Sequence, residues 1–136
     1  MTTTETYRLD GSALPVIPVP HDCVVKHITV EGRTLILRFE ADLARHGSIR
    51  HSHPNAGSLT MRFHMIGKDT CEVYRWRKRI PWIGRAKCWM PATISDLAGK
   101  DQVYLTHRVG ECSVVITLAD AFMDVQADCI DMIWSE

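Results

Sequence analysis

The chain has 136 residues, 46% of them hydrophobic and 24% charged, and its formal net charge is zero with histidine neutral. This is the length of one ordinary domain, which can bury a core without disulfides or a structural metal. The composition excludes disordered, collagen-like and membrane-spanning classes, and the zero net charge excludes an overall field that would attract nucleic acid or a membrane surface.

The cysteines and the N-terminal residues both bear on the compartment. Residues 1–11 contain neither the basic region nor the apolar region of a secretory signal. The cysteine number is odd and no two cysteines form a CxxC pair, so we expect reduced, mostly buried thiols in a cytoplasmic protein. The five are Cys23, Cys71, Cys88, Cys112 and Cys129.

Residues 1–20 are predicted to form an N-terminal arm, and residues 21–136 a single β-rich domain. Pro15, Pro18 and Pro20 close the arm. Because proline cannot donate a ladder hydrogen bond, we expect the arm to be irregular or to extend a sheet edge.

The next two segments predict a β-hairpin. Residues 22–31 place Val24, Ile28 and Val30 on one face, and residues 34–41 alternate apolar and polar side chains. Gly32 supplies the turn between them. Residues 42–57 are rich in Gly, Pro, Asn and Ser, which favours a polar loop with at most one helical turn.

Residues 58–79 predict a second hairpin, around which we expect the rest of the chain to be built. Leu59, Met61, Phe63 and Met65 occupy every second position, and Gly67 begins a turn before the return strand.

The remaining segments complete an all-β pattern. Residues 80–92 predict a long crossover, and residues 93–98 a short helix that ends at Gly99. Residues 103–109 predict a strand with Val103, Leu105, His107 and Val109 on one face. Residues 112–119 and 122–134 predict the last two strands, with a β-bulge near Cys129 where the apolar phase slips. We therefore predict a mainly antiparallel all-β sandwich or barrel of about seven strands with one short helix.

Four histidines form the candidate metal site. His51 and His53 are two residues apart, so in an extended segment both rings project from one side. His46 or His64 would add a third ligand for a divalent transition metal. The alternative is that these histidines are ordinary solvated loop residues, and no cofactor is predicted with them.

A basic and aromatic run forms the candidate partner surface. Arginine, lysine and tryptophan alternate within residues 75–89, a pattern that suits a protein interface or the stacking and phosphate contacts of a nucleic-acid site. The alternative is a solvated face that pairs with the acidic C-terminal segment. The candidate residues are Arg75, Trp76, Arg77, Arg79, Trp82, Arg85 and Trp89.

Two resemblances accompany these patterns. The string His21-Asp22-Cys23-x-Val25-x-x-Ile28, the alternation over residues 35–39 and the pair Tyr104-Leu105 resemble small, uncharacterised β-rich bacterial proteins from toxin–immunity or phage-related loci. This resemblance implies an inhibitor-like or immunity-like binding domain. Gly47 followed by His51-Ser52-His53 resembles the G…HxH motif of cupins, which are small β-barrels, although the glycine is too close and the glutamate expected after the pair is missing.

The leading hypothesis is a non-enzymatic module that binds another protein or a second copy of itself. No nucleophile elbow, phosphate-binding loop or metalloprotease motif is present to indicate an enzyme. A cupin-like metal enzyme using His46, His51, His53 and His64 is the alternative. Nucleic-acid binding through residues 75–87 is a further alternative, disfavoured because the chain lacks the motifs of known nucleic-acid-binding modules.

Overall fold

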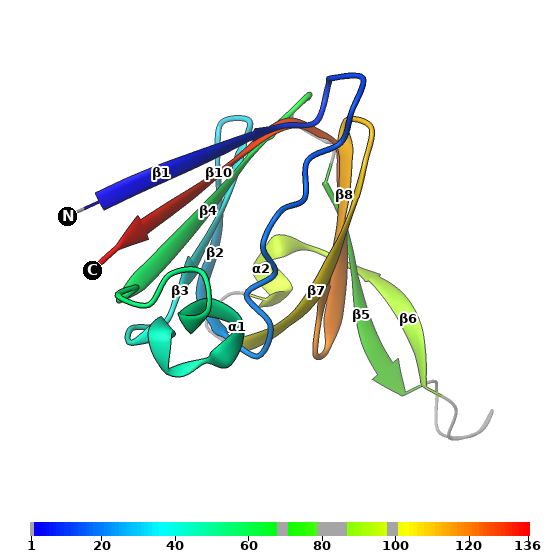
Figure 1. The fold of residues 1–136 in the computed structure, drawn as a ribbon. Coiled ribbons are helices and arrows are strands. Elements are labelled where there is room, and N and C mark those ends of the chain that lie inside the picture. The colour runs from blue at the N-terminus through cyan, green and yellow to red at the C-terminus, as the bar shows by residue number, and fades with distance from the viewer. Residues whose placement is uncertain (1, 68–70, 79–86, 98–100) are drawn as a thin grey trace.

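The computed structural model describes residues 2–67, 71–78, 87–97 and 101–136, with the backbone alone at residues 76–78 and 87–89. Two antiparallel sheets face each other (Figure 1). The first sheet has the order β1-β10-β4-β3-β2, and the second has the order β7-β8-β9-β5-β6. The strands of the first are β1 (Thr2–Arg8), β2 (Val24–Glu31), β3 (Thr34–Phe39), β4 (Ser58–Met65) and β10 (Ala127–Ser135). Those of the second are β5 (Cys71–Lys78), β6 (Lys87–Ala92), β7 (Gln102–Gly110), β8 (Ser113–Leu118) and β9 (Ala121–Val125).

The two sheets join at one corner and remain open elsewhere. Val24 and Val25 of β2 pair with Val103 and Gln102 of β7, so the strand order runs continuously from β1 to β6. These two end strands do not pair with each other in the part of the chain that is described. The all-β antiparallel class is confirmed, and the arrangement is an open sandwich.

The strand count was predicted too low: the described residues form ten strands rather than about seven. One additional strand, β1, lies in the predicted arm, and a second, β6, lies in the predicted crossover. The third arises because residues 122–134 are divided between β9 and β10. Proline argued against β6, β1 was assigned to the arm, and residues 122–134 were interpreted as one strand with a bulge because apolar residues recur along their whole length.

The β2–β3 hairpin is confirmed, with Gly32 at a φ of 63° in its turn. The register shifts between Val25 and His27. This bulge places both Val25 and Ile28 in the core, so the predicted face of the first strand was partly wrong. Val30, two residues after Ile28 and near the hairpin turn, is 42% exposed.

The predicted hairpin of residues 58–79 was wrong, although both of its strands exist. β4 lies between β10 and β3 in the first sheet, and β5 lies between β9 and β6 in the second. The alternation showed correctly that Leu59, Met61 and Phe63 are buried. Alternation carries no information about which strand is the hydrogen-bonded neighbour. Two strands that enclose one core from opposite sheets therefore show the same pattern as the two strands of a hairpin.

The predicted crossover of residues 80–92 was also wrong where the structure describes it. β6 pairs with β5 from Val73↔Ala92 to Lys78↔Lys87. The predicted short helix follows as α2 (Ile94–Leu97), and the Thr93 backbone N–H donates to Asp96 Oδ2 at 2.8 Å. Gly99 lies outside the described residues.

β7 and β8 form the predicted hairpin, but the residues of β7 that face the core differ from the predicted ones. The register shifts between Tyr104 and Thr106. Tyr104 is therefore fully buried before the shift and Val109 packs on the core after it, whereas Val103 and Leu105 are only half-buried.

The chain changes sheets between β9 and β10. Val125 ends β9 in the second sheet and Ala127 begins β10 in the first. The register of β10 against β4 shifts between Ala127 and Cys129, which confirms the predicted bulge. Beyond it, Ile130, Met132 and Trp134 face the core.

The N-terminal segment is part of the body. β1 pairs with β10 along its whole length, which confirms an edge extension. Residues 9–22 then run down the side of the molecule that lies between the two sheets (Figure 1). Leu9 and Ile17 in this segment are buried in the common core.

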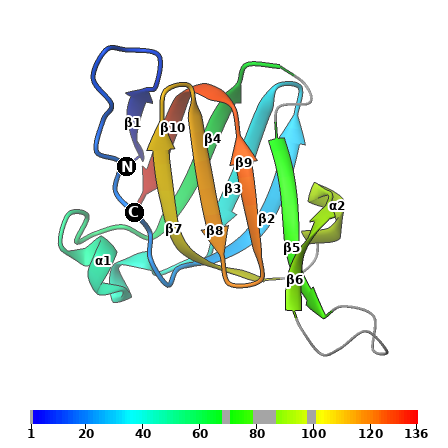
Figure 2. The ribbon, with the colours of Figure 1, turned by 90° about the vertical axis from the view of Figure 1, so that its right-hand side faces the viewer.

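The polar loop contains two short helical turns, η1 (Leu43–Arg45) and α1 (Gly47–Arg50). Figure 2 shows α1 and α2 on opposite sides of the sandwich. Among the described residues, the structure has no helix with the length and apolar character needed to cross a membrane.

Candidate functional site

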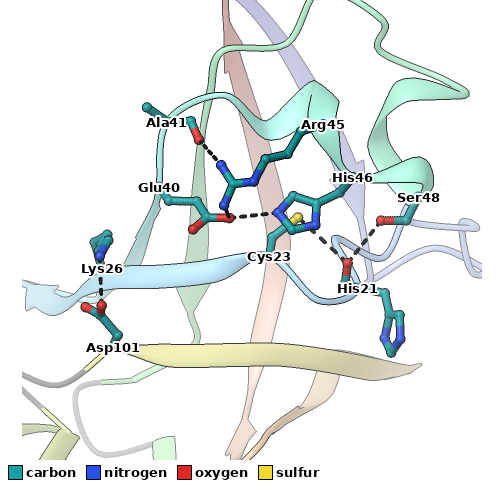
Figure 3. Close-up of polar contacts among 9 residues, drawn as sticks. All are labelled: His21, Cys23, Lys26, Glu40, Ala41, Arg45, His46, Ser48 and Asp101. Atoms are coloured by element: carbon teal, nitrogen blue, oxygen red, sulfur yellow. Dashed lines mark hydrogen bonds and ion pairs between the residues drawn. The ribbon is translucent and has the colours of Figure 1, made fainter.

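The structure places the four predicted metal-binding histidines in separate surroundings. His46 lies near the end of β3, beside Glu40, whose Oε1 accepts a hydrogen bond from His46 Nε2 at 2.8 Å (Figure 3). The same oxygen accepts a bond from Arg45 Nη2 at 2.7 Å. Burial acts to raise the pKa of Glu40, but the bonds from His46 and Arg45 outweigh it and lower this pKa. The cluster therefore fastens the polar loop to the sheet.

His51 and His53 are not in an extended segment. His51 has helical dihedral angles, φ −62° and ψ −42°, and its backbone N–H bonds to the carbonyl oxygen of Gly47. The extended backbone on which the prediction of two rings on one side depended is therefore not present at His51. His51 is exposed, whereas His53 is half-buried.

His53 belongs to a cluster between the polar loop and the first sheet. Its ring stacks on Trp134, with the ring centroids 3.8 Å apart and the planes inclined by 15°. Glu5 of β1 accepts a hydrogen bond from Trp134 Nε1 at 2.6 Å and lies 3.3 Å from His53 Nε2. Trp134 was not singled out as a site residue in the sequence, because nothing in the pattern indicates its neighbour.

This cluster forms one wall of a pocket of about 220 Å³. Thr3 of β1, His53, Pro54, Ala56 and Trp134 are among the residues that line it. Its volume is below the roughly 300–1,000 Å³ of typical small-molecule pockets, so a single side chain fits it better than a whole cofactor.

β1 lies beside this pocket, and no other described strand pairs with its outer backbone edge. The Leu9 N–H donates to the carbonyl oxygen of Asp128 at 2.8 Å, in the register that β1 and β10 share. Because the direction of backbone bonding alternates along an antiparallel strand, Glu5 and Tyr7 also direct theirs toward β10. The residues that direct their backbone groups to the open edge are Thr2, Thr4, Thr6 and Arg8.

His64 of β4 is on the outer face of the first sheet. Its Nε2 lies 2.8 Å from Asp131 Oδ2 on the neighbouring β10. Asp131 is therefore held by a hydrogen bond to the imidazole ring of His64. Among the described residues, no hydrogen bond joins any two of His46, His51, His53 and His64.

The structure describes only part of the basic run. Arg75 is half-buried on β5, and the backbone register places Trp76 opposite Trp89 and Arg77 opposite Cys88. Arg79, Trp82 and Arg85 lie outside the described residues. The hairpin of β5 and β6 thus brings together two parts of the run that the sequence separates.

The buried thiol Cys23 does not have the properties of a nucleophile. It is fully buried, and burial raises its pKa to about 12. The described cysteines Cys23, Cys71, Cys112 and Cys129 are all free.

His107 makes two hydrogen bonds that the sequence did not indicate. Its Nε2 donates to the carbonyl oxygen of Ile17 at 3.0 Å, so its Nδ1 accepts a hydrogen bond from the hydroxyl of Tyr104, at 2.6 Å. This chain of bonds connects the N-terminal segment to β7. It is closed to solvent at Tyr104, which is fully buried.

Comparison with known proteins gives no relative: no protein-family model, no curated protein and no solved structure matches the chain. A functional assignment therefore depends on the geometry of the described residues.

Proposed function

We propose that the protein is a binding module that takes up an extended segment of a partner protein by strand addition to β1. The observation that carries this proposal is the regular outer edge of β1, with which no strand in the described ranges pairs. In strand addition, backbone hydrogen bonds supply affinity and pockets for alternate side chains supply specificity. The backbone edge of β1 and the pocket beside Trp134 both lie at the same end of the first sheet.

β1 lacks three of the features that protect edge strands from pairing, although Glu5 supplies one inward-directed charge, which is bonded to Trp134. It contains no lysine and no proline, and its register with β10 runs without a bulge from Thr2↔Ser135 to Arg8↔Cys129. The other end strand, β6, contains both Lys87 and Pro91. Natural sheets use such residues to block edge pairing, so the unguarded edge is the one suited to a partner.

The pocket beside Trp134 supports the choice of a partner segment. Thr3 belongs to β1 and also lines the pocket, so a strand added to β1 would place one of its alternate side chains near the opening. Pro54, Ala56 and Trp134 contribute apolar surface there. We infer that the bound segment carries an apolar side chain at this position.

A selected peptide provides the probe for a direct test. We would select from a displayed random library of peptides about nine residues long on the full chain, long enough to pair with β1. Thr4→Pro removes an outward N–H and should weaken the selected peptide at least about tenfold, which corresponds to one backbone hydrogen bond and its geometry. Thr4→Val changes the side chain but keeps the N–H, and should retain binding.

The peptide and the amide protons give the confirming measurements. Methylation of alternate peptide amides should abolish binding, while methylation of the intervening amides should not. Hydrogen exchange at Thr4 and Thr6 should slow in the complex, because these amides gain acceptors. A peptide that binds Thr4→Pro as well as it binds the parent chain would contradict the proposal. A homodimer that Thr4→Pro dissociates would identify a second copy as the occupant instead.

A further inference from the structure

We propose that His64, Cys129 and Asp131 form a binding site for a single zinc-like divalent transition metal on the outer face of the first sheet. The site is independent of strand addition, because it uses side chains of β4 and β10 rather than the backbone edge of β1. It differs from the site predicted in the sequence, with which it shares His64 alone.

The strand register brings the three residues together. Cys129 of β10 is directly opposite His64 of β4. Cys129 and Asp131 are two residues apart on β10, so their side chains project from the same face. The bulge between Ala127 and Cys129 sets this phase. A strand without that extra residue would direct Cys129 into the core.

The distances are close to those that a metal requires. One ligand atom from each residue lies within 4.8 Å of the other two, and His64 Nε2 is 2.8 Å from Asp131 Oδ2. A tetrahedral ion with bonds of about 2.0 Å to nitrogen and oxygen and 2.3 Å to sulfur needs ligand atoms about 3.3–3.6 Å apart. Side-chain rotations that move these atoms by less than about 1.5 Å therefore convert the arrangement into a coordination sphere, with the fourth position left for water.

The donor set selects the class of ion. One thiolate, one imidazole and one carboxylate suit zinc and related borderline ions, whereas calcium and magnesium take oxygen ligands. Among the described residues, this is the one group of three potential ligand residues that meets the distance criterion.

The carboxylate is already oriented by a neighbouring strand. Thr6 Oγ1 on β1 donates to Asp131 Oδ1 at 2.7 Å, which leaves Oδ2 directed toward His64. Such outer hydrogen bonds fix the orientation of metal ligands.

Solvent and ions can reach the site from one side. His64 also lines an open, polar hollow of about 450 Å³, together with Arg33, Thr34 and Asp128. Cys129 is 9% exposed. The Cys129 thiol is therefore on the nearly buried side of the site, while the His64 imidazole borders the hollow.

Cobalt(II) binding to the full chain tests the site whatever the natural ion is. The chain is stripped with a chelator under reducing conditions and titrated with Co²⁺. We expect one equivalent to produce a thiolate-to-cobalt charge-transfer band, and Zn²⁺ to remove the band by competition. Cys129→Ser should abolish the band, and Asp131→Asn should weaken Co²⁺ binding at least about tenfold.

Matched variants separate this site from the other histidines and thiols of the chain. Thr6→Val removes only the outer hydrogen bond and should weaken Co²⁺ binding about 10-fold, as outer-shell changes do. His51→Ala and Cys112→Ala should leave the titration unchanged. The absence of a charge-transfer band in the parent chain would overturn the proposal without depending on the folding of any variant. A band that survives Cys129→Ser, or one that is lost with His51→Ala or Cys112→Ala, would also overturn it.

Discussion

At Glu40, one carboxylate oxygen accepts hydrogen bonds from both Arg45 and His46, and the side chain is only 10% exposed. A carboxylate in this position is desolvated, so its partners are required to compensate for the lost water. An ion pair of similar length on the surface has no such requirement. The chain offers one for comparison, between Lys26 Nζ and Asp101 Oδ2 at 2.7 Å, with exposed side chains.

We predict that Glu40→Gln lowers the free energy of unfolding by about 1–3 kcal/mol, because it removes the charge that both donors share. Lys26→Met should change it by less than about 1 kcal/mol. Urea denaturation at neutral pH measures both. Equal effects for the two variants would show that the Glu40 cluster is no more than a surface ion pair.

A second residue-scale prediction concerns His107. Burial lowers the pKa of its ring, although the bond to the Ile17 carbonyl acts in the opposite direction. Below the ordinary histidine pKa of about 6.5, the unfolded chain takes up a proton before the folded chain does. Stability is therefore lost as the pH falls through this range and is unaffected by the titration of His107 at higher pH.

The corresponding experiment follows the urea midpoint between about pH 7.5 and pH 5 in the parent chain and in His107→Gln. The decline with acidification should be smaller in the variant, whatever its stability at neutral pH, because the other titrating groups are common to both chains. Parallel curves would contradict the assignment of a lowered pKa to this ring.

At the scale of elements, β1 allows two adjacent threonines to be compared. Thr3 is an even number of residues from Leu9, so it also directs its N–H toward β10. Thr4 lies between these positions in the alternation and directs its N–H outward. We predict that Thr3→Pro lowers the free energy of unfolding by about 1–3 kcal/mol, through the unsatisfied acceptor on β10. Thr4→Pro should lower it by about 1 kcal/mol or less, because edge positions tolerate proline.

Chemical denaturation of the two proline variants decides this point, and hydrogen exchange shows the cause. The amides of β10 should exchange faster in Thr3→Pro and be little changed in Thr4→Pro. The reverse order of stability would mean that the bonding phase along β1 is opposite to the one that Leu9 indicates. The strand-addition test would then have to use Thr3.

The elements also show how far the sequence could be interpreted. Alternation at Leu59, Met61 and Phe63 correctly predicted a strand and its buried face, since side-chain period depends on the local backbone alone. It could not predict that β4 pairs with β10, because that pairing joins residues far apart in the chain. His64, Cys129 and Asp131 were therefore not brought together from the sequence, although the bulge near Cys129 was predicted.

At the scale of the whole molecule, the segment after β1 acts as part of the core. Leu9 is fully buried and Ile17 is 5% exposed, while Leu14 between them is 45% exposed. Because the side chains of Leu9 and Ile17 are part of the core, the segment after β1 contributes to the free energy of unfolding as a central strand does. The predicted arm of residues 1–20 thus contributes Leu9 and Ile17 to the core, whereas Leu14 and Val16 remain exposed.

We predict that Leu9→Ala lowers the free energy of unfolding by about 2–5 kcal/mol, as truncation of a core leucine does. Leu35→Ala in the central strand β3 should have a similar effect, since Leu35 is also fully buried. Leu14→Ala should change stability by less than about 1 kcal/mol. Thermal and urea unfolding of the three variants measure this, and a mild effect of Leu9→Ala would mean that the segment is only loosely attached.

The pairing of β1 with β10 also has a consequence for the order in which the molecule is made. Residue 2 lies opposite residue 135, so β1 leaves the ribosome long before the strand with which it pairs. Until then β1 is a free, threonine-rich ribbon beside a growing chain, and contacts between such distant residues close slowly. Until β10 is complete, both backbone edges of β1 are therefore unpaired in the nascent chain, whereas in the folded structure β10 covers the inner edge and no described strand pairs with the outer one.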